Sequence, residues 1–427
     1  MKNISRLFLF LILSLWCFGA GCSSDEDCDC ADPSPADDDT AADGTDDDND
    51  DDNDHEETPA PPVLSATEKV VPSDGLPAAV DLQPANNNLD VTRHDGRVFL
   101  AFRTAPSHFA SDQATLYVVS SADQAQWDLE TSIHRGADLR EPRLLSWNGK
   151  LFLYFAVLGT NPLDFQPQGM MVTEYRGPGD WSEPEFFYEE GFIPWRAKVI
   201  DDVPYLLTYV GGENIYDVDP EPMEVHWLTT ADGYQWEPVV PGQPVVITGG
   251  SSETDFVFLD DGSLVAVSRN EMGDKRGFGT NICRAAADNL GDWECVNDPR
   301  KYDSPLVFRH GEEVYLIGRR NLNGTGDYDL GYDDLSPALQ HLLYELDYWI
   351  APKRTALWRI DPESLSVEFV LDFPSRGDTC FPGLLQDSAA EFWVYNYSSP
   401  LRGPDTIWLL GQLSPTYIFR TRMVFPE

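Results

Sequence analysis

Basic residues are scarce in this sequence. The chain of 427 residues has 29 Lys and Arg against 73 Asp and Glu, a formal net charge of −44. Residues 25–57 hold 18 acidic residues and no basic one, and Lys2 and Arg6 are the only charges before them, so residues 58–427 carry −28. A surface with this negative charge repels the phosphate backbone of nucleic acids, so we do not expect nucleic acid as a partner.

Long apolar runs are also lacking. The longest, from Leu7 to Trp16, is too short to span a bilayer. It follows two basic residues, and small residues after it end at Cys22, which predicts a lipoprotein signal peptide over residues 1–21. We expect cleavage before Cys22, lipidation of that residue, and a membrane-anchored protein of the cell envelope that faces the periplasm or the cell exterior. An ordinary signal peptide is the alternative.

The acidic segment after Cys22 has too little apolar surface to fold and repels itself. Pro59, Pro61 and Pro62 end it. We therefore expect residues 22–62 to form a disordered tether and residues 63–427 to form the folded domain, a monomer.

Cysteine is infrequent in the folded part. Cys283 and Cys295 flank a short turn, and in an oxidising compartment they are expected to form a disulfide across a hairpin. Cys380 then has no obvious partner and is interpreted as a buried, unreactive thiol.

Helical periodicity is nearly absent from the folded part, and a repeat takes its place. Six segments share a polar entry, an apolar strand, a turn and a second apolar strand. The starts are Leu89, Arg140, Arg196, Glu253, Asp303 and Asp378. A second hairpin follows each, and in three units it carries Asp before Trp, as in the segment from Ser120 and that from Thr229. The other three are less regular, and that of the last unit is the segment from Thr406. Four strands per unit of about 50 residues predict an all-β, six-bladed β-propeller, with five blades as the alternative.

The interval after the fifth start is longer and contains an insertion, about Asn321 to Pro352. Ser336 and Pro337 mark the start of one expected helix. The acidic stretch Asp327–Asp334 resembles part of a calcium loop but lacks its terminal Glu. We expect no cofactor, with calcium at this stretch as the alternative to a solvated loop.

The stretch from Ser252 to Glu271 shows the repeat most clearly. Apolar strands flank Asp261-Gly262, a strong hairpin signal, with Glu253 at one end and Arg269 at the other. The first strand of a propeller blade lines the central channel, so the charged residues that start these strands are expected to meet there. They include Arg140, Glu141, Arg143, Arg196, Lys198, Glu253, Asp255, Asp303 and Asp378.

Such a ring has two interpretations. Ion pairs between blades are one, because charged side chains are seldom buried unpaired. The other is a site for a glycan, in which guanidinium groups bind a sugar carboxylate and acids act on the glycosidic bond.

The first unit and the stretch around Glu253 resemble the sialidase superfamily of propellers with Asp-box repeats. The resemblance implies that Glu253 and Arg269 belong to the site, that Asp112 is the acid/base residue, and that Arg354 is a further ligand-binding arginine. The nucleophilic Tyr of that family falls near Cys380 and Phe381, and its first arginine near Asn86 to Asn88, so neither residue is present.

The remaining candidates follow from the blade entries. Asp303 and Asp378 are further candidate catalytic carboxylates, and Tyr395 or Tyr397 are possible substitutes for the missing Tyr. The further candidate ligand-binding arginines are Arg140, Arg143, Arg196 and Arg320.

Two functions follow from these candidates. The first is a surface-anchored, sialidase-like glycoside hydrolase. The alternative is a propeller that binds glycans, with Trp195, Tyr332 and Trp349 as stacking aromatics, or that binds proteins.

Overall fold

The computed structural model describes residues 59–161, 165–211 and 222–426. The predicted signal peptide, lipidation site and most of the predicted tether lie outside these ranges. Contacts divide the chain after Ala60, and the second unit, Pro61–Glu427, contains every element described here. No helix of the described part is long and apolar enough to cross a membrane.

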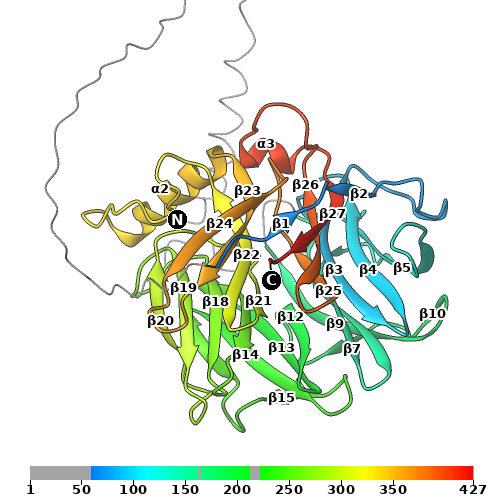
Figure 1. The fold of residues 1–427 in the computed structure, drawn as a ribbon, viewed down its shortest axis with the longest axis horizontal. Coiled ribbons are helices and arrows are strands. Elements are labelled where there is room, and N and C mark those ends of the chain that lie inside the picture. The colour runs from blue at the N-terminus through cyan, green and yellow to red at the C-terminus, as the bar shows by residue number, and fades with distance from the viewer. Residues whose placement is uncertain (1–58, 162–164, 212–221, 427) are drawn as a thin grey trace, which may run out of the picture. The chain divides into compact units, whose positions relative to one another are not determined.

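Six antiparallel sheets make up this unit as the blades of a β-propeller (Figure 1). The sequence predicted this fold, and the alternative of five blades is wrong. The strands of the first blade are β3 (Ala85–His94), β4 (Arg97–Ala105), β5 (Thr115–Ser121) and β6 (Asp128–Ile133). Those of the second are β7 (Asp138–Trp147), β8 (Lys150–Leu158), β9 (Pro167–Gly177), β10 (Asp180–Trp181) and β11 (Glu185–Phe187). Those of the third are β12 (Ile193–Ile200), β13 (Val203–Val210), β14 (Met223–Thr230), β15 (Trp236–Pro238) and β16 (Val245–Gly249).

The last three blades follow the same plan. The fourth blade has β17 (Ser251–Phe258), β18 (Leu264–Asn270), β19 (Thr280–Ala285) and β20 (Glu294–Asp298). The fifth has β21 (Leu306–His310), β22 (Glu313–Asn321), β23 (Lys353–Ile360) and β24 (Val367–Phe373). The sixth has β25 (Gly383–Gln386), β26 (Glu391–Ser398) and β27 (Tyr417–Val424), with β1 (Val63–Leu64) and β2 (Glu68–Val71).

Strands from the two ends of the unit close the ring. Val63 of β1 pairs with Val424 of β27, and Glu68 of β2 pairs with Arg420 of the same strand. The third strand of the sixth blade is therefore β27. The segment from Thr406, which the sequence suggested as part of a hairpin, instead contains the short helix α3 (Trp408–Gln412).

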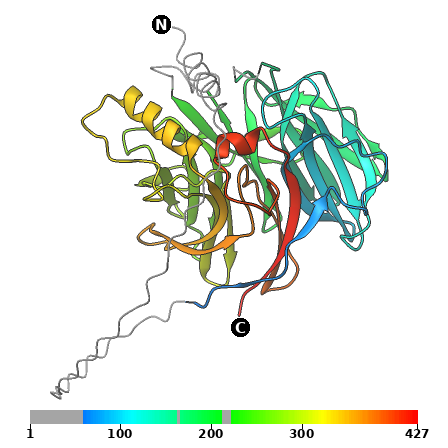
Figure 2. The same cartoon turned by 90° about the horizontal axis from the view of Figure 1, so that it is seen from above.

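The predicted insertion lies between β22 and β23 and contains the helix α2 (Pro337–Ile350), with Ser336 as N-cap. Figure 2 shows α2 and α3 near each other, and Trp349 of α2 packs edge-on against Trp408 of α3. Both helices reach the propeller core, because Tyr348 of α2 donates a hydrogen bond to Asp303 and Trp408 donates one to Asp378.

Local turn chemistry explains why the strands fold back where they do. Asp123, Asp232 and Asp361 each accept hydrogen bonds from backbone N–H groups two and three residues later. These bonds favour the charged carboxylate and lower the pKa of all three.

The hairpin between β17 and β18 is longer than the predicted two-residue turn: it runs from Leu259 to Ser263, with Gly262 in the left-handed region at φ 80°.

A disulfide joins Cys283 of β19 to Cys295 of β20, which are directly paired in the sheet. Cys380 is the free cysteine of the described part, and burial raises the pKa of its thiol to about 12. Such a thiol stays protonated at neutral pH and is a poor nucleophile.

Candidate functional site

The inner strands line the middle of the ring and share one irregularity. Neighbouring inner strands contact each other: β3 with β7, β7 with β12, β12 with β17, β17 with β21, and β25 with β3. Near their first residues, β3, β7, β12 and β17 each contain a β-bulge. The bulges fall at Asn88, Glu141, Trp195 and Ser252–Glu253, and bulges of this kind redirect side chains.

Near the same blade entries, four of the six blades have a non-glycine residue whose φ lies in the left-handed region. They are Asn88 (φ 41°), Glu141 (φ 52°), Ser304 (φ 56°) and Cys380 (φ 85°). A residue with a Cβ costs about 1 kcal/mol or more in this conformation, and such strain gathers at functional sites. We call this end of the central channel, where all six blade entries meet, the mouth.

Solvent reaches a small part of the mouth. The side chains of Glu253, Glu141, Arg140, Arg269 and His108 are 10, 12, 14, 18 and 18% exposed, respectively. Their charged neighbours Asp138, Asp303 and Asp378 are at most 1% exposed. Among the charged residues of the described part, these five side chains are therefore the ones at the mouth that solvent, and with it a ligand, can reach.

Glu141 is the least engaged carboxyl group there. Its Oε1 accepts a hydrogen bond of 3.1 Å from Asn88 Nδ2, whereas its Oε2 has no hydrogen-bond partner in the described part of the chain. The nearest cation is Arg143, whose NH2 lies 3.9 Å from Oε2. Burial, together with the negative charge of Glu253, raises the pKa of Glu141 to about 7. A carboxyl group with such a pKa can donate a proton at neutral pH.

Glu253 is held differently. Its Oε1 accepts from Arg269 NH1 at 2.7 Å and its Oε2 accepts from the backbone N–H of Ser304 at 2.7 Å. Arg269 also binds Glu271 and, through Nε at 2.9 Å, Asp303. Every nitrogen of the Arg269 guanidinium thus lies within ion-pair distance of a carboxylate of the chain, although Nε makes no hydrogen bond within the described residues.

Asp303 joins this group to the fifth blade. Its Oδ2 accepts from Arg319 NH1 at 2.8 Å and from the hydroxyl of Tyr348 at 2.7 Å. Although burial opposes ionisation, Arg269, Lys301 and Arg319 hold the pKa of Asp303 well below its usual range. An acid that remains ionised between buried cations is an anchor for the network and a poor proton donor.

Arg143 lies beneath the mouth and is fully buried. Its guanidinium lies 4.6 Å from the centre of the Trp195 ring and 4.4 Å from that of Phe381. None of its nitrogens has a hydrogen-bond partner in the described part. Burial and the neighbouring charge of Arg196 lower the pKa of Arg143 to about 10, so it remains a cation between two aromatic faces.

Ion pairs between blades lie further along the channel wall. Asp255 binds Lys198 at 2.5 Å and Arg196 at 3.3 Å, and it accepts from the backbone N–H of Val307. Asp90 accepts from the backbone N–H of Leu144 in the next blade. These residues match the interpretation in which charges at the blade entries pack the blades together.

On the opposite part of the mouth, Asp378 holds His108. His108 Nδ1 lies 2.7 Å from Asp378 Oδ2, while Asp378 Oδ1 accepts from the Tyr397 hydroxyl at 3.0 Å and from Trp408 Nε1 at 3.1 Å. Arg140 connects this group to β7, because it donates to the backbone carbonyl of His108 at 2.6 Å and to Asp138.

Tyr209 of β13 lies close enough to Glu141 and Glu253 for both charges to act on its phenol. Burial, with the negative charges of Glu141 and Glu253, raises the pKa of its phenol well above 10. Its hydroxyl therefore stays protonated and neutral at physiological pH.

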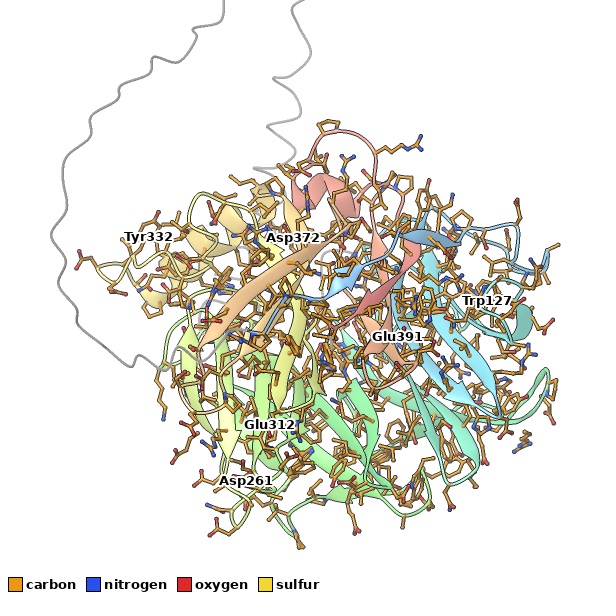
Figure 3. All side chains as sticks on the ribbon, in the orientation of Figure 1. Trp127, Asp261, Glu312, Tyr332, Asp372 and Glu391 are labelled. Carbon is orange, nitrogen blue, oxygen red and sulfur yellow. A yellow bond between two sulfur atoms is a disulfide. The ribbon has the colours of Figure 1, made fainter. Side chains whose placement is uncertain are left out.

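The structure places some predicted site residues at the mouth and others elsewhere. Glu253, Arg269, Asp303, Asp378 and Arg140 lie in the network, with Arg143 and Arg196 beneath it. Asp112 is exposed on the loop that carries His108, four residues away. Arg320 pairs with Asp372, which Figure 3 labels on the outer strand β24, and Arg354 pairs with Asp405; the structure does not bring these two arginines into the network.

The suggested aromatic residues also have other contacts. Tyr397 donates to Asp378, whereas Tyr395 donates to Gln124. Trp195 is buried against Arg143, Trp349 donates to Glu345, and Tyr332 lies on the insertion, as Figure 3 shows.

The sequence did not single out His108, Arg319 or Tyr209, nor the role of Glu141. Arg319 and Arg320 are adjacent on β22, and because both faces of a blade are buried, alternation alone does not choose between them. His108 lies in a loop without any local pattern. Glu141 was visible at a blade entry, but its free oxygen depends on a bulge that no sequence signal marks.

Residues 59–161, 165–211 and 222–426 contain no group of three or more His, Cys, Asp or Glu side chains placed to hold a metal ion. Within the acidic stretch of the insertion, Asp329 accepts hydrogen bonds from the N–H groups of Phe278 and Gly331. The alternative of calcium binding at this stretch is untested.

No protein-family profile matches the sequence, and no curated protein is similar to it. Solved structures do match in fold. A protein of unknown function from Dyadobacter fermentans has a TM-score of 0.55 and 16% identity over 80% of this chain and 95% of its own. A phage phi92 endosialidase has a TM-score of 0.54 and 11% identity over 85% and 69%.

The sialidase of Trypanosoma rangeli, solved with sialic acid, has a TM-score of 0.53 and 12% identity over 79% of this chain. The match covers 54% of that sialidase, so this chain spans about half of its length. At these identities the likeness shows the fold, a sialidase-like propeller.

Proposed function

We propose that this protein is a glycoside hydrolase whose active site is the mouth of the propeller, with Glu141 as proton donor and Glu253 as the charged carboxylate beside it. The observation that carries the proposal is the pair itself: Glu141, whose side chain is 12% exposed and whose buried Oε2 has no hydrogen-bond partner in the described part of the chain, lies within electrostatic reach of Glu253, a carboxylate held by Arg269 and a backbone N–H. Glycoside hydrolysis uses one carboxyl group that donates a proton to the leaving oxygen and a charged partner.

Burial raises the pKa of both glutamates, but at Glu253 the positive charges of Arg269 and Arg319 and the Ser304 N–H oppose the rise and favour the charged form. Glu141 has a pKa of about 7 and keeps its proton when solution is slightly acid. The oxocarbenium-like charge that develops on the sugar carbon is stabilised by a nearby negative charge, which Glu253 supplies. Its bonds to Arg269 and Ser304 fix its position and occupy one lone pair on each oxygen, leaving others for the sugar.

The arginines favour a neutral sugar at the mouth. Arg269 binds three carboxylates of the chain and Arg140 binds Asp138, so a ligand carboxylate would have to displace them. The name of the solved sialidases implies an acidic sugar as their substrate. The occupied arginines of this protein favour a neutral sugar, so the proposed substrate class differs from theirs.

The test is hydrolysis of a panel of methylumbelliferyl glycosides, neutral and acidic, by the full chain and by Glu141→Gln. The proposal expects turnover of at least one neutral glycoside and a loss of about 100-fold or more in the variant. Glu312→Gln is the matched control, because Glu312 is exposed at the β21–β22 turn (Figure 3). No turnover by the wild type, or equal turnover by Glu141→Gln, would contradict the proposal.

A glycan-binding propeller without catalysis is the second candidate. It is favoured by Cys380 and Phe381, which stand where the related enzymes have their nucleophilic Tyr. Binding of oligosaccharides on a glycan array with no hydrolysis of any of them would support this candidate over the first.

We also propose that Cys22 is lipidated and that the protein is anchored at the cell envelope. The support is the sequence around Cys22 alone. Mass spectrometry of the mature N-terminal peptide is the test: acylated Cys22 supports the anchor, and an unmodified N-terminus contradicts it.

A further inference from the structure

His108 has the geometry of a group that accepts a proton at its outer nitrogen. A carboxylate only accepts hydrogen bonds, so the 2.7 Å contact between Nδ1 and Asp378 Oδ2 places the ring proton on Nδ1. Nε2 then carries a lone pair. The side-chain hydrogen bonds of His108 within the described part of the chain both involve Nδ1, and the side chain is 18% exposed at the mouth.

The surroundings hold this arrangement. Asp378 is fully buried, and the Tyr397 hydroxyl and Trp408 Nε1 fix its other oxygen. The backbone N–H of His108 donates to Gln412, and its carbonyl accepts from Arg140. Asn87 Nδ2 lies 3.4 Å from Nδ1, a much longer contact than that to Asp378.

The charges around the ring keep it neutral. Burial lowers the pKa of His108, the positive charges of Arg140 and Arg103 lower it further, and Asp378 opposes them. The balance is a pKa below the usual value, so the imidazole is unprotonated at neutral pH and available as a base.

Glu253 is a weak nucleophile, because hydrogen bonds from Arg269 and the Ser304 N–H stabilise the negative charge on both of its oxygens. The phenol of Tyr209 stays protonated, and Tyr397 donates to Asp378. The described residues of the mouth thus favour a mechanism in which a base activates water over one in which a side chain attacks the sugar.

We propose that His108, oriented by Asp378, is a catalytic base that activates the water molecule which attacks the glycan. This inference rests on the proposed function. In the step, the water oxygen bonds to the anomeric carbon as the glycosidic C–O bond breaks. Glu141 gives its proton to the leaving oxygen, and a water proton passes to His108 Nε2. Asp378 stabilises the resulting imidazolium, which returns the proton to solvent. A single displacement by water inverts the anomeric configuration.

The first experiment compares His108→Gln with wild type in the full chain, using the methylumbelliferyl glycoside that the wild type cleaves. The expected result is a fall in kcat of about 100-fold or more with little change in KM, in a protein whose thermal transition is retained. His134→Gln is the matched control, because His134 Nδ1 contacts a backbone carbonyl rather than a carboxylate and the side chain lies exposed in the loop between β6 and β7. Wild-type kcat in His108→Gln would overturn the inference.

Two further measurements separate a base from a merely structural residue. The acid limb of the pH profile of kcat/KM should move to lower pH in Asp378→Asn, because the carboxylate raises the pKa of His108 and its loss lowers it. The first sugar released by wild type, observed by proton NMR before mutarotation, should have the inverted configuration. Retention, or an unmoved acid limb in a folded Asp378→Asn, would overturn the inference.

The pattern of results tells the two proposals apart. A wild type that cleaves, with a large loss in Glu141→Gln and none in His108→Gln, leaves the proposed function standing and removes His108 from it. A wild type that cleaves no glycoside overturns both.

Discussion

The pKa of Glu141 makes a prediction about stability that needs no substrate. In the unfolded chain this carboxyl titrates near 4.5, and in the folded protein burial raises its pKa to about 7. Between these values the folded state binds one more proton than the unfolded state, so the free energy of unfolding falls as pH rises. Each unit of difference corresponds to about 1.4 kcal/mol, which gives about 3.4 kcal/mol in all. About 2.5 kcal/mol of this falls between pH 5 and pH 8.

Glu141→Gln removes the titrating group and keeps its shape and its contact with Asn88. The variant should therefore gain about 2.5 kcal/mol relative to wild type when the pH is raised from 5 to 8. Unfolding in urea, monitored by tryptophan fluorescence at the two pH values, measures this difference without adding salt.

The control is Glu183→Gln, a side chain that is 90% exposed and whose difference from wild type should be the same at both pH values. A Glu141→Gln difference that stays constant from pH 5 to pH 8 would refute the reasoning, because it would mean that Glu141 titrates as an ordinary carboxyl group.

Three further predictions concern stability. Asp303→Asn leaves buried Arg319 and partly exposed Arg269 without their shared carboxylate and should lower the free energy of unfolding at pH 7 by about 3–5 kcal/mol; a loss below about 1 kcal/mol in urea unfolding would show that the network is dispensable. Replacing Cys283 and Cys295 by Ser opens a loop of 12 residues and should cost about 3 kcal/mol, and unchanged unfolding after reduction of wild type would contradict this. Asp232→Ala removes an acceptor of two backbone N–H groups and should lower stability by about 1 kcal/mol, whereas an unchanged thermal transition would show that the turn forms without it.

The propeller could be predicted because its signal is local and repeated. Alternating apolar strands, polar turns and a period near 50 residues recur six times, and each copy supports the others. The segment from Thr406 was misinterpreted because a short apolar run fits a helix turn as well as a strand. The closure by β1 and β2 depends on pairing between the two ends of the unit, which no local pattern contains.

The site could be predicted in part. The acidic and basic blade entries pointed to the mouth, because the first strand of each blade lines the channel. Which of these charges is free and which is neutralised depends on contacts between blades: Arg269 is occupied by Asp303 from the next blade, and Glu141 is left open by a bulge. His108 is held at the mouth by contacts distant in sequence, among them that with Asp378, 270 residues later.

The central claim is that Glu141 delivers a proton to the leaving oxygen at the mouth of the propeller. The most direct measurement compares wild type and Glu141→Gln on two aryl glycosides of one sugar, with phenyl and dinitrophenyl leaving groups. A dinitrophenolate leaves without protonation, so the variant should lose about 100-fold or more in kcat/KM on the phenyl glycoside and less than about 10-fold on the other. Equal losses on both glycosides, or no loss on either, would contradict the claim.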